Sequence, residues 1–182
     1  MKKLTTLVIM LTAFYCNCSA QAYFTKNGRI SFFSSTPMED IKADNNQVIS
    51  VINTATGDLQ FSLLNNAFHF KKALMEEHFN ADYMESAKFP KSTFKGIISH
   101  VSSVNFNTDG TYNVTVSGSL TIHGVTKTIS VPGTIKVNAG KISATSAFKI
   151  RPKDYNISIP AAVKNNIAET LELTISCQYE KK

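Results

Sequence analysis

The sequence has no tryptophan and three cysteines, at positions 16, 18 and 177. Cys16 and Cys18 lie in an N-terminal segment that we expect to be removed, so the mature chain keeps only Cys177. An exported domain with one thiol cannot form an internal disulfide, so an apolar core must hold the fold. Twelve phenylalanines and six tyrosines supply much of that core. Cys177 falls on the apolar parity of its segment, which predicts a buried, inert thiol.

The chain also lacks a long hydrophobic run. Its N-terminal apolar stretch covers residues 4–15, which is shorter than the ~20 residues that a spanning helix needs. Lys2 and Lys3 precede this stretch and small residues at 18–20 follow it. The pattern is typical of a secretory signal peptide cleaved after Ala20.

This interpretation divides the chain into a signal peptide at 1–20 and a single domain at 21–182. It predicts a periplasmic or secreted protein. A lipid anchor at Cys16 or Cys18 remains an alternative, because both residues lie near the cleavage point.

Basic residues are in excess but scattered. The formal net charge of +6 falls to +4 when Lys2 and Lys3 are removed. No stripe of lysine and arginine interleaved with aromatic residues is present, which argues against nucleic acid as a partner. The charge allows a transient contact with a membrane surface. The sequence leaves a homodimer open.

Catalytic motifs are absent from the sequence. It contains no Gly-x-Ser-x-Gly, His-Glu-x-x-His or Cys-x-x-Cys, and no phosphate-cradling glycine loop. The four histidines, at 69, 78, 100 and 123, are not spaced as metal ligands on one element. We therefore predict a protein that is not an enzyme and that has neither a metal nor a cofactor.

The clearest structural signal is a β-hairpin centred on His123-Gly124. Apolar residues alternate with Thr and Ser on both sides of this dipeptide. A two-residue loop would place the apolar parities on one face, with the pairs Ile122–Val125, Leu120–Lys127 and Gly118–Ile129. The simplest role for His123 is that of a turn residue.

The same alternation predicts eight strands, at 24–33, 47–53, 58–64, 93–106, 111–122, 125–137, 141–150 and 170–179. The fourth would bend near 102–103, and Pro132-Gly133 could interrupt the sixth. Polar stretches at 44–46 and 160–169 are expected to be connections on the rim. The predicted fold class is mainly all-β, an eight-stranded antiparallel lipocalin-like β-barrel of up-and-down topology.

One segment breaks this pattern. Between the third and fourth strands, residues 70–85 are rich in helix formers and predict a short helical insertion that covers one end of the barrel. Phe70, Leu74 and His78 recur at a spacing of four. His78, Asp82 and Glu85 could share a helical face and meet a polar head group, although a solvated face is the slightly better interpretation.

The barrel interior is the main candidate site. Gly118, Ala144 and Ser146 are small inward residues, so the middle could hold an elongated ligand. A packed core is the alternative and is equally compatible with the residues. Lys127 lies on the apolar parity near the hairpin tip, where it could meet an anionic head group or extend into water. His100 shares parity with inward residues and is best explained as a core or rim histidine.

Three blocks, at 78–96, 120–127 and 148–157, resemble the YceI-like proteins, which are secreted lipocalin-like barrels that bind polyisoprenoid-type lipids. The resemblance implies non-catalytic binding, storage or transport of an amphiphilic isoprenoid lipid such as a quinone or a polyprenyl carrier. Two departures are the histidine-free stretch at 31–43 and Asn156, where the family usually has glycine. A structural, stress-related or adhesion module acting through its outer surface is the alternative function. The predicted ligand-binding residues are Phe70, Leu74, His78, Phe79, Phe94, Leu120, Ile122, Lys127 and Phe148.

Overall fold

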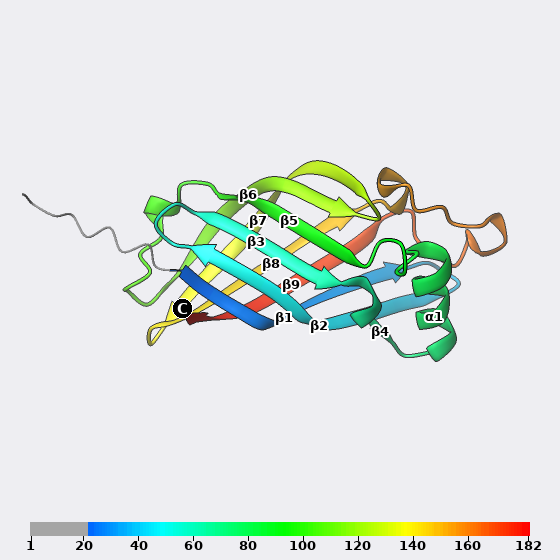
Figure 1. Ribbon diagram of the computed structural model, residues 1–182, viewed down its shortest axis with the longest axis horizontal. Helices are drawn as coiled ribbons and strands as arrows, with labels where there is room; N and C mark the ends of the chain where they lie inside the picture. The colour runs from blue at the N-terminus through cyan, green and yellow to red at the C-terminus, as the bar shows by residue number, and fades with distance from the viewer. Residues whose placement is uncertain (1–21) are drawn as a thin grey trace, which may run out of the picture.

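Segments of alternating apolar and polar residues form the strands of an elongated barrel (Figure 1). The computed structural model describes residues 22–182. The predicted signal peptide, with Cys16 and Cys18, lies outside the described residues. The barrel strands are β1 (Ala22–Ser35), β2 (Asp40–Asn53), β3 (Asp58–Leu64), β5 (Lys91–Ile98), β6 (Gly110–Ile122), β7 (Val125–Asn138), β8 (Lys141–Ile150) and β9 (Leu171–Lys181).

Each of the eight barrel strands pairs antiparallel with the next barrel strand along the chain, and β1 pairs with both β2 and β9 to close the cylinder. Closure removes exposed sheet edges. A two-residue strand, β4 (His69–Phe70), adds to β2 outside this ring. The predicted eight-stranded antiparallel barrel is confirmed.

The β6–β7 hairpin has the predicted register. Ile122 pairs with Val125 and Leu120 with Lys127, and the loop consists of His123 (φ 49°) and Gly124 (φ 73°). Pro132 lies inside β7 and pairs with Thr115 of β6, so the proline does not interrupt β7.

On its other side, β7 is paired with β8 along only part of its length. It pairs with β8 only between residues 134–138 and 141–145. Just beyond this ladder the Ser146 hydroxyl donates to the Pro132 carbonyl oxygen at 2.6 Å. Proline has no N–H and cannot continue the ladder. We call the unpaired stretch, between 125–133 of β7 and 146–150 of β8, the side seam.

The predicted fourth strand is too long. β5 ends at Ile98, and the chain then turns through His100, which is exposed and left-handed (φ 55°), into a 3₁₀ turn at Val101–Ser103. The Ser103 N–H and hydroxyl both donate to the His100 carbonyl, which stabilises the turn. Of the two predicted positions for His100, core or rim, the structure shows the rim.

The predicted polar connection at 44–46 is also wrong, because these residues lie inside β2. Asn45 is fully buried. Its side-chain amide donates to the Leu64 carbonyl at 2.9 Å, and its oxygen accepts from the Gln47 N–H. A buried side-chain amide is tolerated when its hydrogen bonds are made. The polar residues 44–46 can therefore continue the strand instead of forming a loop.

The helical insertion lies between β3 and β5, as predicted, and consists of α1 (Ala73–His78) followed by a π turn (Phe79–Tyr83). In Figure 1 it lies at the same end of the barrel as the segment between β8 and β9. That segment contains the 3₁₀ turns Pro152–Tyr155 and Ala161–Val163. We call this end the mouth; the chain end at Lys182 lies at the other, closed end. No helix within residues 22–182 is long and apolar enough to cross a membrane.

Candidate functional site

The interior of the barrel contains a cavity of about 340 Å³, to which inward side chains of all eight barrel strands contribute. Small-molecule sites in proteins commonly have volumes of roughly 300–1,000 Å³ and mostly apolar walls. The lining here is almost entirely aliphatic and aromatic. The described residues therefore enclose a space of ligand size instead of a filled core.

The closed end of the cavity is tightly packed. Ile52, Ile98 and Ile135 are each at most 2% exposed. The Tyr179 hydroxyl lies 2.7 Å from the Ser50 hydroxyl, and burial raises the pKa of Tyr179 well above its ordinary value. Cys177 is 1% exposed, so the prediction of a buried thiol is confirmed. Burial raises the pKa of this thiol to about 11, which disfavours the reactive thiolate.

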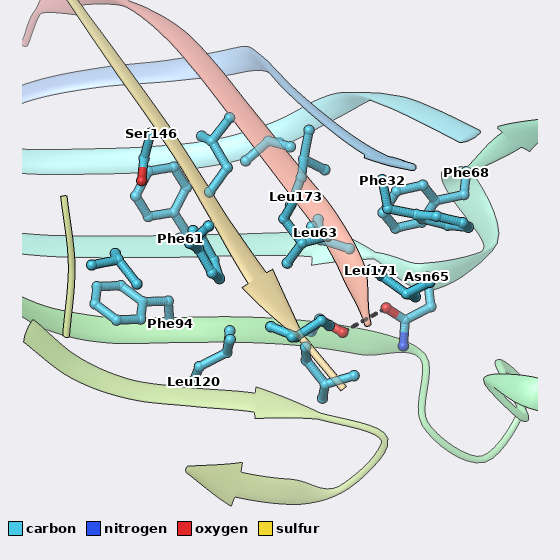
Figure 2. Close-up of a pocket in the computed structure, with 18 of the residues that line it drawn as sticks. Phe32, Phe61, Leu63, Asn65, Phe68, Phe94, Leu120, Ser146, Leu171 and Leu173 are labelled. Carbon is cyan, nitrogen blue, oxygen red and sulfur yellow. Dashed lines mark hydrogen bonds between the residues drawn. The ribbon is translucent and has the colours of Figure 1, made fainter. Parts of the chain in front are cut away.

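Four phenylalanines form one wall of the mouth: Phe32, Phe68, Phe70 and Phe79. We call them the phenylalanine cluster. The ring centroids of Phe70 and Phe79 are 5.1 Å apart, and those of Phe32 and Phe68 are 5.6 Å apart. Figure 2 shows Phe32 and Phe68 side by side at this end of the pocket. Tilted and edge-on ring pairs are favourable, so the cluster gives the mouth a firm apolar surface.

The middle of the cavity only partly matches the prediction from small residues. Ala144 and Ser146 do line it. The space above Gly118, however, holds the ring of Phe94, since a Cβ on Gly118 would lie 2.8 Å from Phe94 Cζ. Phe94 and Phe61 extend into the lumen from β5 and β3 (Figure 2). Gly118 therefore makes room for an aromatic ring of the wall.

Seven of the nine predicted ligand-binding residues line the cavity: Phe70, His78, Phe79, Phe94, Leu120, Ile122 and Phe148. Leu74 and Lys127 are absent from the lining. Leu74 is 61% exposed on α1, and Lys127, although it pairs with Leu120, is exposed to solvent. A long lysine side chain reaches water easily from an apolar parity. Ligand contact by any of the nine stays a prediction.

A polar cluster at the mouth was not anticipated from the sequence. Glu39 lines the cavity, and its carboxylate accepts from Lys72 Nζ at 2.8 Å and from Asn166 Nδ2 at 3.4 Å. Hydrogen bonds from Lys72 and then Asn166 lower the pKa of the Glu39 carboxyl. Glu39 thus connects the β1–β2 turn to the insertion and to the β8–β9 segment. No local pattern could reveal this, because the partners are 33 and 127 positions away.

Other polar groups of the lining are bonded within the protein. The Asn65 amide donates to the Phe89 carbonyl at 2.6 Å, and its oxygen accepts from the Ser92 hydroxyl at 2.8 Å (Figure 2 shows Asn65 at the pocket edge). Ser146 donates to Pro132. A ligand inside the barrel would therefore meet chiefly carbon atoms.

His123 does more than form a turn. Its Nε2 lies 2.8 Å from the Glu85 carboxylate, its Nδ1 lies 3.2 Å from the Tyr155 carbonyl oxygen, and its ring packs on Phe89. The predicted shared face of His78, Asp82 and Glu85 does not form, because the helix ends before Glu85, which has a positive φ of 42°. Glu85 instead fastens the insertion to the hairpin tip.

Among the histidine, cysteine, aspartate and glutamate side chains of residues 22–182, no group is arranged to hold a metal ion.

The closed eight-stranded antiparallel barrel with an apolar lumen defines a lipocalin-like fold. A family model described as the YceI-like domain matches residues 16–179, and the chain belongs to this family. No curated protein matches the sequence.

Solved structures of several proteins share the fold. A polyisoprenoid-binding domain from Saccharophagus degradans, implicated in plant cell wall breakdown, has a TM-score of 0.76 at 17% identity, covering 90% of this chain and 99% of that one. BcnA from Burkholderia cenocepacia has a TM-score of 0.65 at 14% identity, with 84% and 96% covered. A YceI protein from Campylobacter jejuni has a TM-score of 0.54 at 17% identity, with 100% and 92% covered.

Proposed function

We propose that this protein binds an isoprenoid-type amphiphilic lipid, such as a quinone or a polyprenyl carrier, in the barrel lumen and stores or transports it without chemical change. The observation that carries the proposal is the apolar cavity, closed at the Tyr179 end and bordered by half-buried residues at the mouth. The structural neighbour from Saccharophagus degradans is described as polyisoprenoid-binding, which supports the same ligand class.

The energetics suit such a ligand. Burial of apolar surface contributes ~0.8 kcal/mol per CH₂, so one isoprene unit contributes on the order of 3 kcal/mol. A few units would outweigh the cost of ordering the chain. We propose that the tail lies toward the closed end and the head toward the mouth. We also propose that the domain acts in the periplasm or after secretion, once residues 1–20 are removed.

The alternative, an adhesion or structural role for the outer face, has less support. The outward hydroxyls of β6 and β7 are paired with one another, with Thr121 2.8 Å from Thr126 and Ser117 2.8 Å from Ser130. These hydroxyl contacts are satisfied within the sheet and leave fewer groups for a partner.

The experiment is native mass spectrometry of the mature protein purified from its own host, followed by organic extraction and identification of any released molecule. A bound mass that matches a quinone or polyprenyl species is expected. A clean apoprotein mass, together with no uptake from added lipid extracts, would contradict the proposal.

A further inference from the structure

The side seam interrupts the barrel wall at a place apart from the mouth. The β7–β8 ladder ends at the pair Thr134–Thr145, and beyond it no backbone pairing joins residues 125–133 of β7 to residues 146–150 of β8. On their other sides both strands stay paired along the whole seam, β7 with β6 and β8 with β9. The wall is therefore continuous on either side of the seam and has no backbone ladder across it.

Side-chain contacts define both ends of the side seam. At the inner end, the Ser146 hydroxyl donates to the Pro132 carbonyl oxygen at 2.6 Å. At the outer end, the 3₁₀ turn that follows β8 lies against the hairpin tip, where the Tyr155 carbonyl oxygen is 3.2 Å from His123 Nδ1. Tyr155 is buried in the same apolar cluster as Ile122. The side seam is therefore bounded on all sides, and the His123 contact separates it from the mouth.

The cavity reaches the side seam from inside. Ile129 and Val131 of β7 and Phe148 of β8 line the cavity, and all three are only half-buried. By contrast, Ile135 and Ile142, inward residues of the paired part of the two strands, are each 1% exposed. The apolar lining is thus more accessible where the ladder is missing than where it is complete.

Free space lies between the strands at the point where the ladder stops. Thr134 and Thr145 line the cavity, although their positions alternate with the inward residues of β7 and β8. Gly133, the residue before Thr134, is also part of the lining, and a Cβ built on it would meet nothing closer than 3.5 Å. The lumen therefore extends to the edges of the two strands instead of ending at their inward side chains.

The side seam can widen at a lower cost than the mouth. At the mouth, Glu39 is bonded to Lys72 of the insertion and to Asn166 of the β8–β9 segment, and Glu85 contacts His123. Separation of these segments would break contacts of charged groups, which are among the stronger hydrogen bonds. Separation of β7 from β8 along the seam breaks no backbone hydrogen bond.

The side seam suits the passage of an apolar chain but not its storage. The N–H and C=O groups that face across the seam have no backbone partner there. An apolar chain that stayed between the strands would keep water from these groups, which is unfavourable. A chain in the lumen would instead contact the aliphatic and aromatic lining.

We propose that the side seam is a lateral portal. Residues 129–133 of β7 and 146–149 of β8 separate transiently, and the apolar chain of a ligand enters and leaves the lumen sideways between them. This inference rests on the proposed function, because it requires a lipid chain in the lumen. It adds the route of exchange, which is distinct from the mouth.

The test closes the side seam with a covalent bridge. Ser130→Cys and Lys149→Cys place thiols at exposed positions that would face each other if the β7–β8 ladder continued in register. A bismaleimide with a disulfide in its spacer joins the two thiols, and dithiothreitol cuts the spacer again. Ser119→Cys with Thr128→Cys, an exposed pair in the complete β6–β7 ladder, is the matched control. Cys177 is buried and should stay unmodified, and mass spectrometry confirms one bridge per molecule.

The probe is a farnesol analogue that carries a fluorescent nitrobenzoxadiazole group. Stopped-flow fluorescence measures its entry on mixing with the protein and its exit on displacement by excess unlabelled farnesol, and circular dichroism confirms the fold of each variant. The bridge across the side seam should slow entry and exit by at least about tenfold each, and should leave Kd, the ratio of the two rate constants, within about twofold. Dithiothreitol should restore both rates, and the control bridge should change neither.

Unchanged rates in the protein bridged across the seam would show that the chain passes through the mouth, so the portal would be wrong and lipid binding would still stand. A wild type that binds neither the probe nor unlabelled farnesol, as measured by native mass spectrometry, would contradict the proposed function itself.

Discussion

The imidazole Nε2 of His123 lies 2.8 Å from the carboxylate of Glu85, although the two residues are 38 positions apart. This contact fastens the helical insertion to the β6–β7 hairpin, and the Phe89 ring packs against the same imidazole at a centroid distance of 4.4 Å. The His123 side chain is 10% exposed and that of Glu85 is 42% exposed. The contact therefore holds one side of the mouth in place.

The first prediction concerns this contact. In the His123→Asn variant, asparagine at position 123 still accepts a positive φ, but its side chain is too short to contact Glu85. We expect the free energy of unfolding to fall by about 1 kcal/mol, because a charge-assisted hydrogen bond contributes about 1.5–3 kcal/mol and the exposure of Glu85 reduces it. Urea denaturation measures the change.

Hydrogen exchange locates the effect of His123→Asn. Amides of residues 71–91 should exchange faster than in the wild type, while those at the closed end should not change. Glu77→Gln, at an exposed position on α1, is the control. Unchanged exchange in the insertion would show that His123 does not fasten it.

The second prediction concerns the lumen. Leu120→Trp places an indole in the cavity, so we expect lipid uptake to be lost while the fold is kept, because the cavity can accommodate the larger side chain. Ser119→Trp, the outward-facing neighbour on β6, is the matched control and should bind normally. Native mass spectrometry gives the occupancy of both variants. Stoichiometric lipid in Leu120→Trp would place the ligand outside this lumen.

The third prediction compares two glycines. Gly118→Ala should lower the free energy of unfolding by about 1–3 kcal/mol, since its Cβ would overlap the Gly96 backbone and lie 2.8 Å from Phe94. Gly133→Ala meets nothing closer than 3.5 Å and should be neutral or stabilising by up to about 1 kcal/mol. Urea denaturation measures the free energy of unfolding of both variants. Equal changes in the two variants would contradict the tight packing of Gly118 against Gly96 and Phe94.

The fourth prediction concerns alkaline pH. The pKa of the Cys177 thiol is raised in the folded protein from 9.0 to about 11 by burial. The unfolded chain therefore loses this proton first, so the stabilisation is complete below pH 9 and is lost as the pH rises through 11. The difference between these two pKa values corresponds to about 3 kcal/mol in the free energy of unfolding.

Urea denaturation from pH 8 to 11 measures this dependence. Cys177→Ala should show a smaller decline than the wild type. Part of the decline will remain, because burial also raises the pKa values of Tyr83, Tyr155 and Tyr179. An identical pH dependence in both proteins would show that the Cys177 thiol does not contribute to the alkaline loss of stability. In the folded wild type, iodoacetamide should modify Cys177 only at the rate of unfolding.

The fifth prediction concerns the side seam. Between residues 125 and 131 of β7, every second amide faces β8 but has no backbone partner there. The same holds for the amides between residues 147 and 150 of β8 that face β7. Hydrogen exchange followed by NMR should show these amides exchanging faster than their neighbours that face β6 or β9. Uniform protection along both strands would mean that the seam is closed in solution.

Much of the fold follows from local sequence. The strict alternation around His123-Gly124 determined the hairpin register, since a slip by one residue would have exposed every apolar side chain. The same periodicity located β3 and β8 at their observed bounds and placed Leu120, Ile122 and Phe148 inside the barrel. Periodicity misjudged 44–46 and 93–106, because tertiary hydrogen bonds satisfied Asn45 and a left-handed turn stopped β5 at Ile98.

The sequence by itself determined the barrel class, the buried thiol and most of the apolar wall, because these depend on residue type and on a period of two. Only the tertiary structure decided that the lumen stays partly open, that Phe94 fills the space above Gly118, and that Glu39 faces the mouth. Those features depend on contacts between residues far apart in sequence, such as Glu39 with Asn166 and His123 with Glu85. Such contacts arise only when the closed barrel brings the segments together.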